Sequence, residues 1–443
     1  MSETPAGRKP LHKRLLGPPY RAVRERLWPF RPRRIAALLV WGASVARTIL
    51  RRRRDRRLTV GIDVSPLFEP LTGIGWYLYR LLEELAPRED LALRLYGPTL
   101  AADEEAPEPS RPIPTGPAIE VVTYGTPEDA VLPRGRLISL LGRLAPRLIA
   151  ADANRVIFAP NYLPSERFAR ARGALVATVH DLGYRRVPWS LQPETLERLE
   201  GALDEAWFRA ARVITDSRAV GREIVAEGLA RADRVRVIPL GPAHSPPEPS
   251  ALPPLPAGVC APLALWVGTL EPRKNVATLL AAWRILRRRL SDSPLLVLVG
   301  RFGWKTEALR RKVEAAASEG WLRHLGYLSD GELAALYRAA SVFVFPSFYE
   351  GFGLPVLEAL GAGTPVVASD LPVLRELAGA AAVYAPSRKP EVWAREIEGI
   401  LADPGLARRL AEAGAERARS FTWAESAKRH LEVFREVAGE GSS

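Results

Sequence analysis

Residues 341–369 read SVFVFPSFYEGFGLPVLEALGAGTPVVAS. The run SVFVFPS has the β-branched and aromatic content of a buried strand, and TPVVAS reads as a second strand. Between them Leu354-Pro355 can open a helix, because the fixed φ of proline suits the first helical positions. A strand, a helix and another strand in succession predict a βαβ unit and therefore a parallel sheet.

The same stretch carries two carboxylates, Glu350 and Glu358, eight residues apart. Gly351, Phe352 and Gly353 precede the predicted helix, whose unpaired N–H groups and macrodipole attract a phosphate. Ionised carboxylates accept hydrogen bonds without donating any, so they suit vicinal hydroxyls. A nucleotide-sugar supplies both kinds of partner: a diphosphate for the helix end, and the hydroxyls of its sugar and ribose for the two acids. The plainer alternative makes Glu358 a helix-dipole acid and Glu350 a surface residue.

The rest of the chain repeats the strand and helix alternation on both sides of a proline-rich segment. Residues 241–262 hold eight prolines and cannot sustain a helix or a sheet ladder, so they predict a linker. We therefore expect two doubly wound, Rossmann-like α/β domains that face a central cleft, where a ligand lies beyond the carboxyl ends of the strands. The predicted strands are TVGIDV, LALRLYG, IEVVTY, RVIFAP, ALVATVHD, RVITDS and RVRVIPLG before the linker, and PLALWVGT, LLVLVG, LRHLGY, SVFVFPS, TPVVAS and AAVYAP after it.

Length and composition agree with two folded domains. The chain has 443 residues, 47% of them apolar and 26% charged, and a single core stops growing near about 250–300 residues. The one cysteine, Cys260, forms no internal disulfide and indicates an intracellular protein. The predicted parts are an N-terminal basic extension (1–57), an N-terminal domain (58–241), the linker (242–262), a C-terminal domain (263–425) and a final helix that crosses back to the N-terminal domain (426–443).

The positive charge lies at the N-terminus, where residues 1–58 hold 17 Lys and Arg against three acids, a net of +14, whereas the other 385 residues carry −1 of the total of +13. The apolar run 35–50 lies between arginine clusters, and its 16 residues are too short for the roughly 30 Å of hydrocarbon. The arginines that follow it argue against a secretory signal peptide. We expect a helix at the interface of an anionic membrane, with Trp28, Phe30 and Trp41 at the headgroups. The alternatives are a helix docked on the protein's own body and, with less support, nucleic-acid binding.

Cations and a histidine follow two other predicted strands. VGTLEPRKN begins with a strand that ends near Gly268 and places Arg273 and Lys274 just beyond it, where they can neutralise a leaving diphosphate. TVHDLGY places His180 and Asp181 at a strand's carboxyl end, where functional side chains of such sheets gather. Taken singly, the adjacent Arg273 and Lys274 are also typical of a solvated basic turn, and His180 and Asp181 are also typical of a buried His–Asp pair.

A short glycine motif follows the first strand, in PLFEPLTGIGWYLYRLLEEL. Gly73 and Gly75 are predicted in a loop that opens a helix, although a lone G-x-G is more often a tight turn. A dinucleotide-dependent oxidoreductase would need a third glycine, which GIGWYLY lacks. No D-x-D motif and no cluster with the spacing of metal ligands is found.

Together these motifs resemble the retaining glycosyltransferases of the GT-B fold, specifically the large family four, over roughly residues 58–437. The most specific part is E-x7-E, Glu350 to Glu358, preceded by GTLEPRKN. The resemblance implies that Glu350 binds donor-sugar hydroxyls, that Glu358 binds the ribose, and that His180 touches the transferred sugar. It also implies a site for the donor diphosphate, formed by Arg273, Lys274, Gly268, Gly73, Gly75 and the amides of Gly351, Phe352, Gly353 and Leu354. The nucleotide base would lie near Leu325, Gly326 and Tyr327. The acceptor side would include Asp181 and Tyr184.

The activity implied by this resemblance is transfer of a hexose with retained anomeric configuration and without a metal or other cofactor. We expect GDP-mannose as the donor and a lipid-linked saccharide as the acceptor, in synthesis of a cell-surface polysaccharide at the inner face of the cytoplasmic membrane. The N-terminal 58 residues depart from the common family core. A UDP- or dTDP-sugar donor, another acceptor, and a catalytically silent nucleotide-sugar-binding protein are the alternatives.

Overall fold

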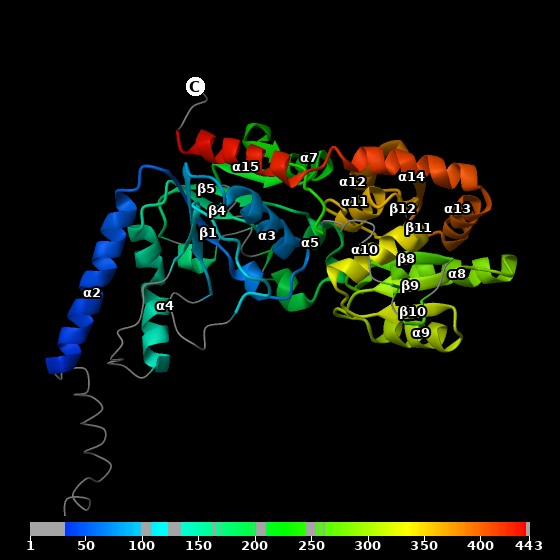
Figure 1. Cartoon of the computed structure of the whole chain (residues 1–443), viewed down its shortest axis with the longest axis horizontal. Coiled ribbons are helices and arrows are strands. Elements are labelled where there is room, and N and C mark those ends of the chain that lie inside the picture. The colour runs from blue at the N-terminus through cyan, green and yellow to red at the C-terminus, as the bar shows by residue number, and fades with distance from the viewer. Residues whose placement is uncertain are drawn as a thin grey trace, which may run out of the picture.

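Two parallel sheets with helices on both faces lie side by side in the computed structural model (Figure 1). The arrangement is the pair of doubly wound domains that the alternating sequence predicts. Each of the thirteen predicted runs overlaps a strand of one of the two sheets. The structure describes residues 32–98, 108–122, 134–162, 165–168, 170–197, 199–200, 210–244, 254–255, 257–259 and 262–439.

The N-terminal sheet has, within the described residues, seven parallel strands in the order β3-β2-β1-β4-β5-β6-β7. Every residue of the interior strands β1 and β2 is buried, as is typical of a parallel sheet covered on both faces, and the buried residues include Arg94. The strands are β1 (Leu58–Asp63), β2 (Leu91–Tyr96), β3 (Ile119–Val121), β4 (Val156–Ala159), β5 (Ala174–Thr178), β6 (Arg212–Thr215) and β7 (Val235–Val237). Helices of this domain with described bounds include α3 (Gly73–Leu85), α4 (Arg134–Ala151), α5 (Gly183–Arg186) and α7 (Arg218–Ala226), with short 3-10 turns η3 (Ser65–Phe68), η4 (Glu166–Phe168), η5 (Pro188–Ser190) and η6 (Ala232–Arg234).

The C-terminal sheet repeats this design with six parallel strands, in the order β10-β9-β8-β11-β12-β13 among the described residues. Its strands are β8 (Leu263–Val267), β9 (Leu295–Val299), β10 (Leu322–Leu325), β11 (Ala340–Phe345), β12 (Val366–Ser369) and β13 (Ala382–Ala385). Its helices are α8 (Val276–Arg289), α9 (Glu307–Ser318), α10 (Asp330–Ala339), α11 (Leu354–Gly361), α12 (Pro372–Ala378), α13 (Pro390–Ala402) and α14 (Pro404–Ala418), with 3-10 turns η8 (Pro272–Lys274) and η9 (Gly379–Ala381).

In each sheet the chain order reverses between two neighbouring strands. These are β1 and β4 in the N-terminal sheet, and β8 and β11 in the C-terminal sheet. Ligands of open α/β sheets bind beyond the carboxyl ends of the strands at such a reversal. The segments that follow β8 and β11 carry Arg273, Lys274 and Glu350, so the fold alone places these three residues at a binding position.

The final helix, α15 (Trp423–Val437), runs from the C-terminal domain across to the N-terminal one (Figure 1). It begins three residues before the predicted start at 426, because the side chain of Thr422 caps it by accepting a hydrogen bond from the Glu425 amide. On α15, His430 Nε2 lies 2.7 Å from the hydroxyl of Tyr77 in α3. The helix thereby ties the two domains together.

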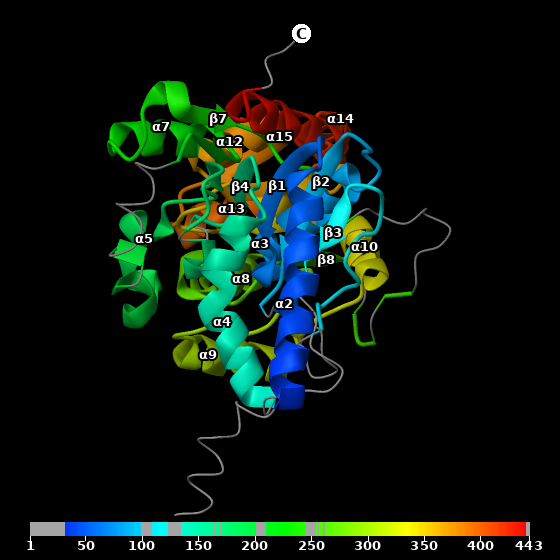
Figure 2. The ribbon, with the colours of Figure 1, turned by 90° about the vertical axis from the view of Figure 1, so that its left-hand side faces the viewer.

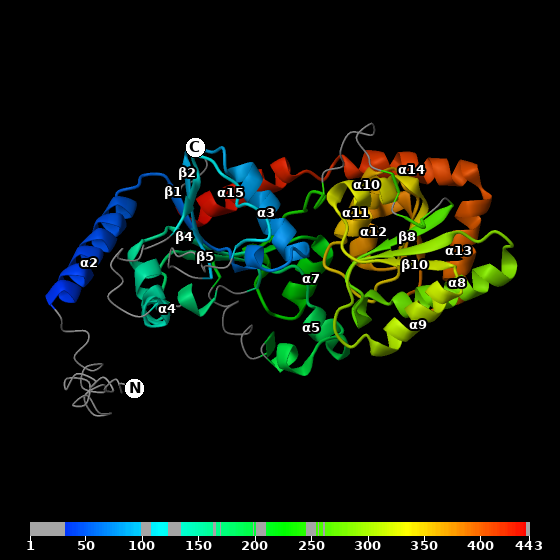
Figure 3. The same cartoon turned by 60° about the horizontal axis from the view of Figure 1, so that its bottom comes forward.

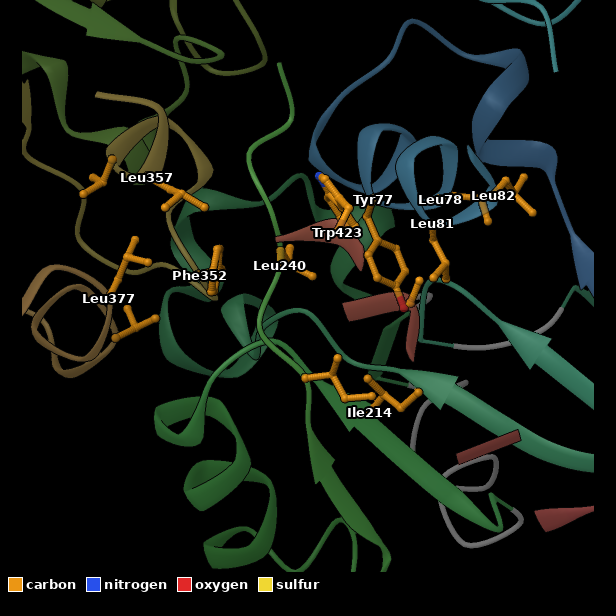
Figure 4. Close-up of a cluster of buried hydrophobic side chains, with 14 of the residues drawn as sticks. Tyr77, Leu78, Leu81, Leu82, Ile214, Leu240, Phe352, Leu357, Leu377 and Trp423 are labelled. Atoms are coloured by element: carbon orange, nitrogen blue, oxygen red, sulfur yellow. The ribbon is translucent and has the colours of Figure 1, made fainter. Parts of the chain in front are cut away.

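One buried apolar cluster is continuous across the domain boundary. Figure 4 shows Tyr77 and Trp423 on one side of Leu240 and Phe352 on the other, and all four are at most 7% exposed. Burial of apolar side chains is the main favourable contribution to folding, so a shared core resists separation of the domains. The two domains are therefore held together at this boundary.

Helix α2 (Pro32–Arg53) extends the predicted apolar run at both ends. Figures 2 and 3 show α2 beside α4, and both project from the N-terminal domain. On α2, Val45 is buried in a cluster with Ala145 and Ile149 of α4. The predicted placement of Trp28 and Phe30 at lipid headgroups lies outside the described residues.

Buried charges fix the C-terminal end of α2. Arg52 is 5% exposed; its Nε lies 2.8 Å from Glu120 and its Nη1 lies 3.2 Å from Asp152. Arg94, which is fully buried, donates to the backbone carbonyl of Arg52 at 2.7 Å. The docking on the protein body that the sequence left open thus holds for this end of the helix. Among the described residues, no helix is both long and apolar enough to span a bilayer.

Candidate active site

Two cations and one carboxylate meet at the carboxyl end of β8. Lys274 Nζ lies 2.7 Å from Oε1 of Glu350, and Arg273 Nη1 lies 3.1 Å from its Oε2. Arg273 also pairs with Glu271, through its Nη2 at 2.9 Å. The E-x7-E motif and the GTLEPRKN motif, more than 70 residues apart, therefore form one cluster, as the sequence led us to expect.

Burial and charge set the protonation of this cluster. Burial raises the pKa of Glu350, which is 6% exposed, but the charges of Lys274 and Arg273 outweigh it and hold that pKa below its ordinary value. Burial lowers the pKa of Arg273, whereas the carboxylates of Glu350 and Glu271 outweigh it and raise that pKa. Glu350 and Arg273 are therefore both ionised at neutral pH. The cations are thus preorganised for an anion, and Glu350 is held as an acceptor.

The N-terminus of α11 lies directly after Glu350. Gly353 is its N-cap, with φ of 105°, a conformation that favours glycine, and a Cβ there would lie only 2.8 Å from Leu374 Cδ2. Pro355 occupies one of the first two helical positions, as predicted from its fixed φ. No acidic side chain lies in the first turn of α11, so its amides retain their attraction for an anion.

The N-terminus of α3 faces α11 from the other domain. Gly73 and Gly75 are the first and third residues of α3, inside the helix rather than in the loop that the sequence predicts. A Cβ at Gly73 would lie 4.0 Å from Leu354 Cδ1, so the two helix ends are neighbours across the cleft. A Cβ at Gly75 would lie 2.7 Å from the Leu71 side chain, which explains a small residue there. Two helix N-termini without acidic first turns converge at this position.

Glu358 lies on α11 one turn beyond the cap, slightly deeper in the helix than predicted. Its Oε2 accepts a hydrogen bond of 2.8 Å from the Tyr337 hydroxyl. Its Oε1 accepts one of 2.7 Å from Nδ1 of His244 and one of 3.2 Å from the amide of the same residue. The carboxylate is 8% exposed and is held by partners from α10 and from the interdomain linker.

His180 follows β5, and its backbone carbonyl lies against Gly351 of the C-terminal domain. Its Nδ1 lies 2.7 Å from Asp216 Oδ2, and its Nε2 lies 2.9 Å from the carbonyl of Pro160. Burial lowers the pKa of His180, but the Asp216 charge outweighs it and raises that pKa above its ordinary value. Both ring nitrogens thus have partners inside the N-terminal domain, and contact of the His180 ring with the transferred sugar stays a prediction. A Cβ at Gly351 would collide with the His180 carbonyl, so the peptides of the two residues pack against each other.

The residues assigned to the acceptor side separate in the structure. Asp181 is partly exposed and accepts hydrogen bonds from the Tyr162 hydroxyl at 3.0 Å and the Gly183 amide at 2.7 Å. Its negative charge also acts on Arg273, which places it near the cation cluster. Tyr184 is 3% exposed and packs in an apolar cluster of the N-terminal domain. The burial of its ring argues against the predicted acceptor contact.

The predicted base site lies beside the same edge of the C-terminal sheet. The Gly300 amide donates to the carbonyls of Leu325 at 3.0 Å and Gly326 at 3.1 Å. A Cβ at Gly300 would collide with the Gly268 carbonyl, so the ends of β8, β9 and β10 approach closely. Tyr327 is 74% exposed, which leaves its ring free to stack on a planar ligand.

Comparison with known proteins fixes the family. The family model "Glycosyl transferases group 1" matches residues 259–417, and "Glycosyltransferase Family 4" matches residues 71–245. The chain is 32% identical over 380 residues to O-antigen chain mannosyltransferase B of Escherichia coli, covering 81% of this chain and 94% of that protein. The chain belongs to the group 1 glycosyl transferases.

Solved structures show the same fold. This glycosyltransferase aligns with the sucrose-phosphate synthase of Thermosynechococcus elongatus at 24% identity and a TM-score of 0.64, over 87% of this chain and all of that one. It aligns with Anabaena HepE, solved in complex with UDP and glucose, at 18% identity and a TM-score of 0.62, over 86% of this chain and all of that one. The GT-B architecture predicted from the sequence is thereby confirmed.

The site of this glycosyltransferase also includes several residues that the sequence did not indicate. His244 and Tyr337 hold Glu358, and Asp330 at the start of α10 lies 3.7 Å from His244 Nε2. Arg111 pairs with Asp330 at 2.6 Å and stacks on Trp76. The only sequence signal was the position of His244 at the start of the predicted linker. Within the described residues, no group of three or more His, Cys, Asp or Glu has the arrangement of a metal site.

Proposed function

We propose that this glycosyltransferase moves a mannose, with retention of its anomeric configuration, from GDP-mannose to a lipid-linked saccharide in cell-surface polysaccharide synthesis. Its similarity to an O-antigen chain mannosyltransferase supports the sugar and the kind of product. The observation that carries the proposal is the convergence of Arg273, Lys274 and Glu350 beside the N-terminus of α11. This arrangement combines two cations and helix amides for a diphosphate with one carboxylate for the sugar hydroxyls.

Each group then has one chemical role. Arg273, Lys274 and the amides of Phe352 to Leu354 hold the diphosphate, Glu358 binds the ribose, and Glu350 exchanges part of its ion pairing for sugar hydroxyls. The bond from the anomeric carbon to the phosphate oxygen breaks while the acceptor oxygen bonds to that carbon from the same face. The acceptor proton passes to the departing phosphate oxygen. Catalysis is mainly electrostatic stabilisation of the leaving group, together with positioning, and we assign no metal to it.

The acceptor proposal depends on the basic helices of the N-terminal domain. The sequences of α2 and α4 contain ten arginines and no acid, and the two helices project together from one side of the molecule (Figure 2). Basic amphipathic helices bind anionic lipid surfaces, with each nearby arginine contributing about 1 kcal/mol. We propose that they place the cleft at the cytoplasmic face of the membrane, where lipid-linked saccharides present their sugars.

Turnover tests the activity. Purified protein is given GDP-, UDP-, dTDP- and ADP-sugars with bacterial lipid extract, and release of the nucleoside diphosphate is measured. GDP-mannose is expected to give the fastest release, and Glu350→Ala is expected to abolish it. Faster release from a UDP- or dTDP-sugar would show that GDP-mannose is not the preferred donor. No release from any of the sugars would favour a catalytically silent binding protein. Unchanged turnover by Glu350→Ala would remove Glu350 from the site.

Membrane attachment has its own test. Deleting residues 1–57 would also remove the buried Arg52, so exposed arginines are the better targets. The variant Arg47→Glu/Arg54→Glu is expected to bind anionic vesicles at least about tenfold more weakly, because each reversed charge loses its attraction to the lipid. Arg408→Glu/Arg409→Glu, at exposed positions of α14, is the matched control. Equal binding by both variants would contradict this role of α2.

A further inference from the structure

The carboxylate of Glu358 has nearly all of its accepting capacity in use. Its Oε1 takes two hydrogen bonds from His244, one from Nδ1 at 2.7 Å and one from the amide at 3.2 Å. Its Oε2 takes one from the Tyr337 hydroxyl at 2.8 Å. Each carboxylate oxygen offers about two accepting positions. Oε1 is therefore full, and one position on Oε2 remains for an incoming hydroxyl.

The backbone around His244 is fixed by both neighbouring helices of the domain boundary. The carbonyl of Pro242 accepts a hydrogen bond of 2.7 Å from Trp423 Nε1 in α15. The carbonyl of Ala243 accepts one of 2.7 Å from Arg80 Nε in α3. The start of the linker is thus held in place before it reaches Glu358, so His244 is a rigid donor.

The ring of His244 is also constrained on its other sides. It lies edge-on to Trp76 of α3, with 4.6 Å between the ring centroids. Its Nε2 lies 3.7 Å from Oδ1 of Asp330, which in turn pairs with Arg111. The carboxylate partner at Nδ1 fixes the hydrogen on that nitrogen in either protonation state. The ring is thus oriented by α3 of one domain and by α10 and α11 of the other.

A cavity of about 270 Å³ lies against this pair, and Pro242, His244, Tyr337, Leu357 and Glu358 are among the residues that line it. A space of this size gives the Glu358 side chain somewhere to turn if His244 no longer holds it. A buried carboxylate that loses a donor rotates toward another donor or toward water, because an unsatisfied buried charge is costly. The orientation of Glu358 therefore depends on His244 and is not guaranteed by packing alone.

We propose that His244 is a positioning residue for nucleotide recognition: by occupying Oε1 of Glu358 it leaves Oε2 to meet one ribose hydroxyl, and it couples that carboxylate to the interdomain linker. This inference rests on the proposed role of Glu358 in ribose binding. It assigns a function to the first residues of the linker, which the sequence predicted only as a connection. Ribose recognition then depends on the contacts of His244 with Glu358 of α11 and Asp330 of α10.

Discrimination between ribose and deoxyribose forms tests the inference. Binding of GDP and of UDP, each compared with its 2′,3′-dideoxy form, is measured by calorimetry for the wild-type protein. A hydrogen bond to a charged group is worth about a tenfold preference or more for the ribose form. His244→Ala is expected to reduce this preference to about twofold while changing the affinity for the dideoxy form little. His244→Asn, which keeps a nitrogen donor near the position of Nδ1, is expected to restore the preference.

Two further results separate this inference from the function on which it rests. If His244→Ala weakened the affinity for the ribose and dideoxy nucleotides equally, the positioning role would be overturned, because a purely structural defect does not distinguish the two forms. A wild-type protein without any ribose preference would overturn it as well, but would leave sugar transfer and the diphosphate site standing. Circular dichroism and thermal unfolding of each variant exclude a folding defect, and His244→Asn remains informative if His244→Ala does not fold.

Discussion

The ammonium of Lys274 lies 2.7 Å from the carboxylate of Glu350, although 76 residues separate the two in sequence. Lys274 ends the 3-10 turn after β8, and Glu350 follows β11, the neighbouring strand in the sheet. Their approach is thus a consequence of the order of strands at the point of reversal. Lys274, the proposed cation for the phosphates, is therefore in direct contact with Glu350, the proposed acceptor of hydrogen bonds from the sugar.

Removal of this cation should affect chemistry more than donor binding. Lys274→Ala is expected to lower kcat by about 100-fold to 1000-fold, because one donor to the developing charge is lost. Steady-state kinetics with the donor found to be active is the measurement. Lys312→Ala on the exposed face of α9 is the control and should have wild-type kinetics. A change confined to KM would show that Lys274 only binds the donor.

Acid should weaken the cluster around Glu350. The pKa of this carboxyl is lowered, so its ionised form contributes stability that is complete above its ordinary value of 4.5 and is lost as the pH falls through the lower native value. The free energy of unfolding in urea is measured for wild type and Glu350→Gln between pH 3 and pH 7. The advantage of the wild type should shrink below about pH 4.5. An advantage that stays constant over this range would contradict the ion pairing.

His430 should add a second acid sensitivity in a different pH range. Its ring is fully buried, and burial lowers its pKa from 6.5 to about 4. The neutral ring therefore contributes stability that is present above pH 6.5 and declines as the pH falls toward 4, by about 3 kcal/mol in total. Urea unfolding at pH 7 and pH 4.5 should show this loss in the wild type and less of it in His430→Gln. Equal losses would mean that His430 does not titrate in this way.

The end of α2 should depend on one arginine. Arg52→Ala leaves Asp152 buried without this partner, which typically costs about 3–5 kcal/mol. The free energy of unfolding in urea should fall by that order. Arg54→Ala, at an exposed position two residues later, should leave it nearly unchanged. Similar losses in both variants would indicate a general effect of charge rather than an anchor at Arg52.

The fold was largely predictable because it depends on local patterns. Runs such as SVFVFPS and TPVVAS are short, apolar and flanked by helical segments, which is enough to predict strands of a parallel sheet. The clustering of Arg273, Lys274 and Glu350 was predictable for the related reason that parallel strands all end at one edge. Family resemblance added the separate roles of Glu350 and Glu358.

The partners of these residues could not be predicted, because no local pattern encodes contacts between distant elements. His244 lies 114 residues from Glu358 in the sequence, and the two residues meet only in the folded chain. Asp216, directly after the neighbouring strand β6, pairs with Nδ1 of His180, a contact that the sequence did not indicate. Gly73 and Gly75 were predicted in a loop but begin α3, since no strong stop signal separates them from the helix.

A crystal structure of the protein with the nucleoside diphosphate of its active donor would test the central claim most directly. The β-phosphate is expected within hydrogen-bonding distance of Lys274 Nζ, the Arg273 guanidinium and the backbone amide of Leu354. The claim would be contradicted if the diphosphate lay elsewhere, with Arg273 and the amides at the start of α11 directed into separate regions that no single diphosphate could bridge.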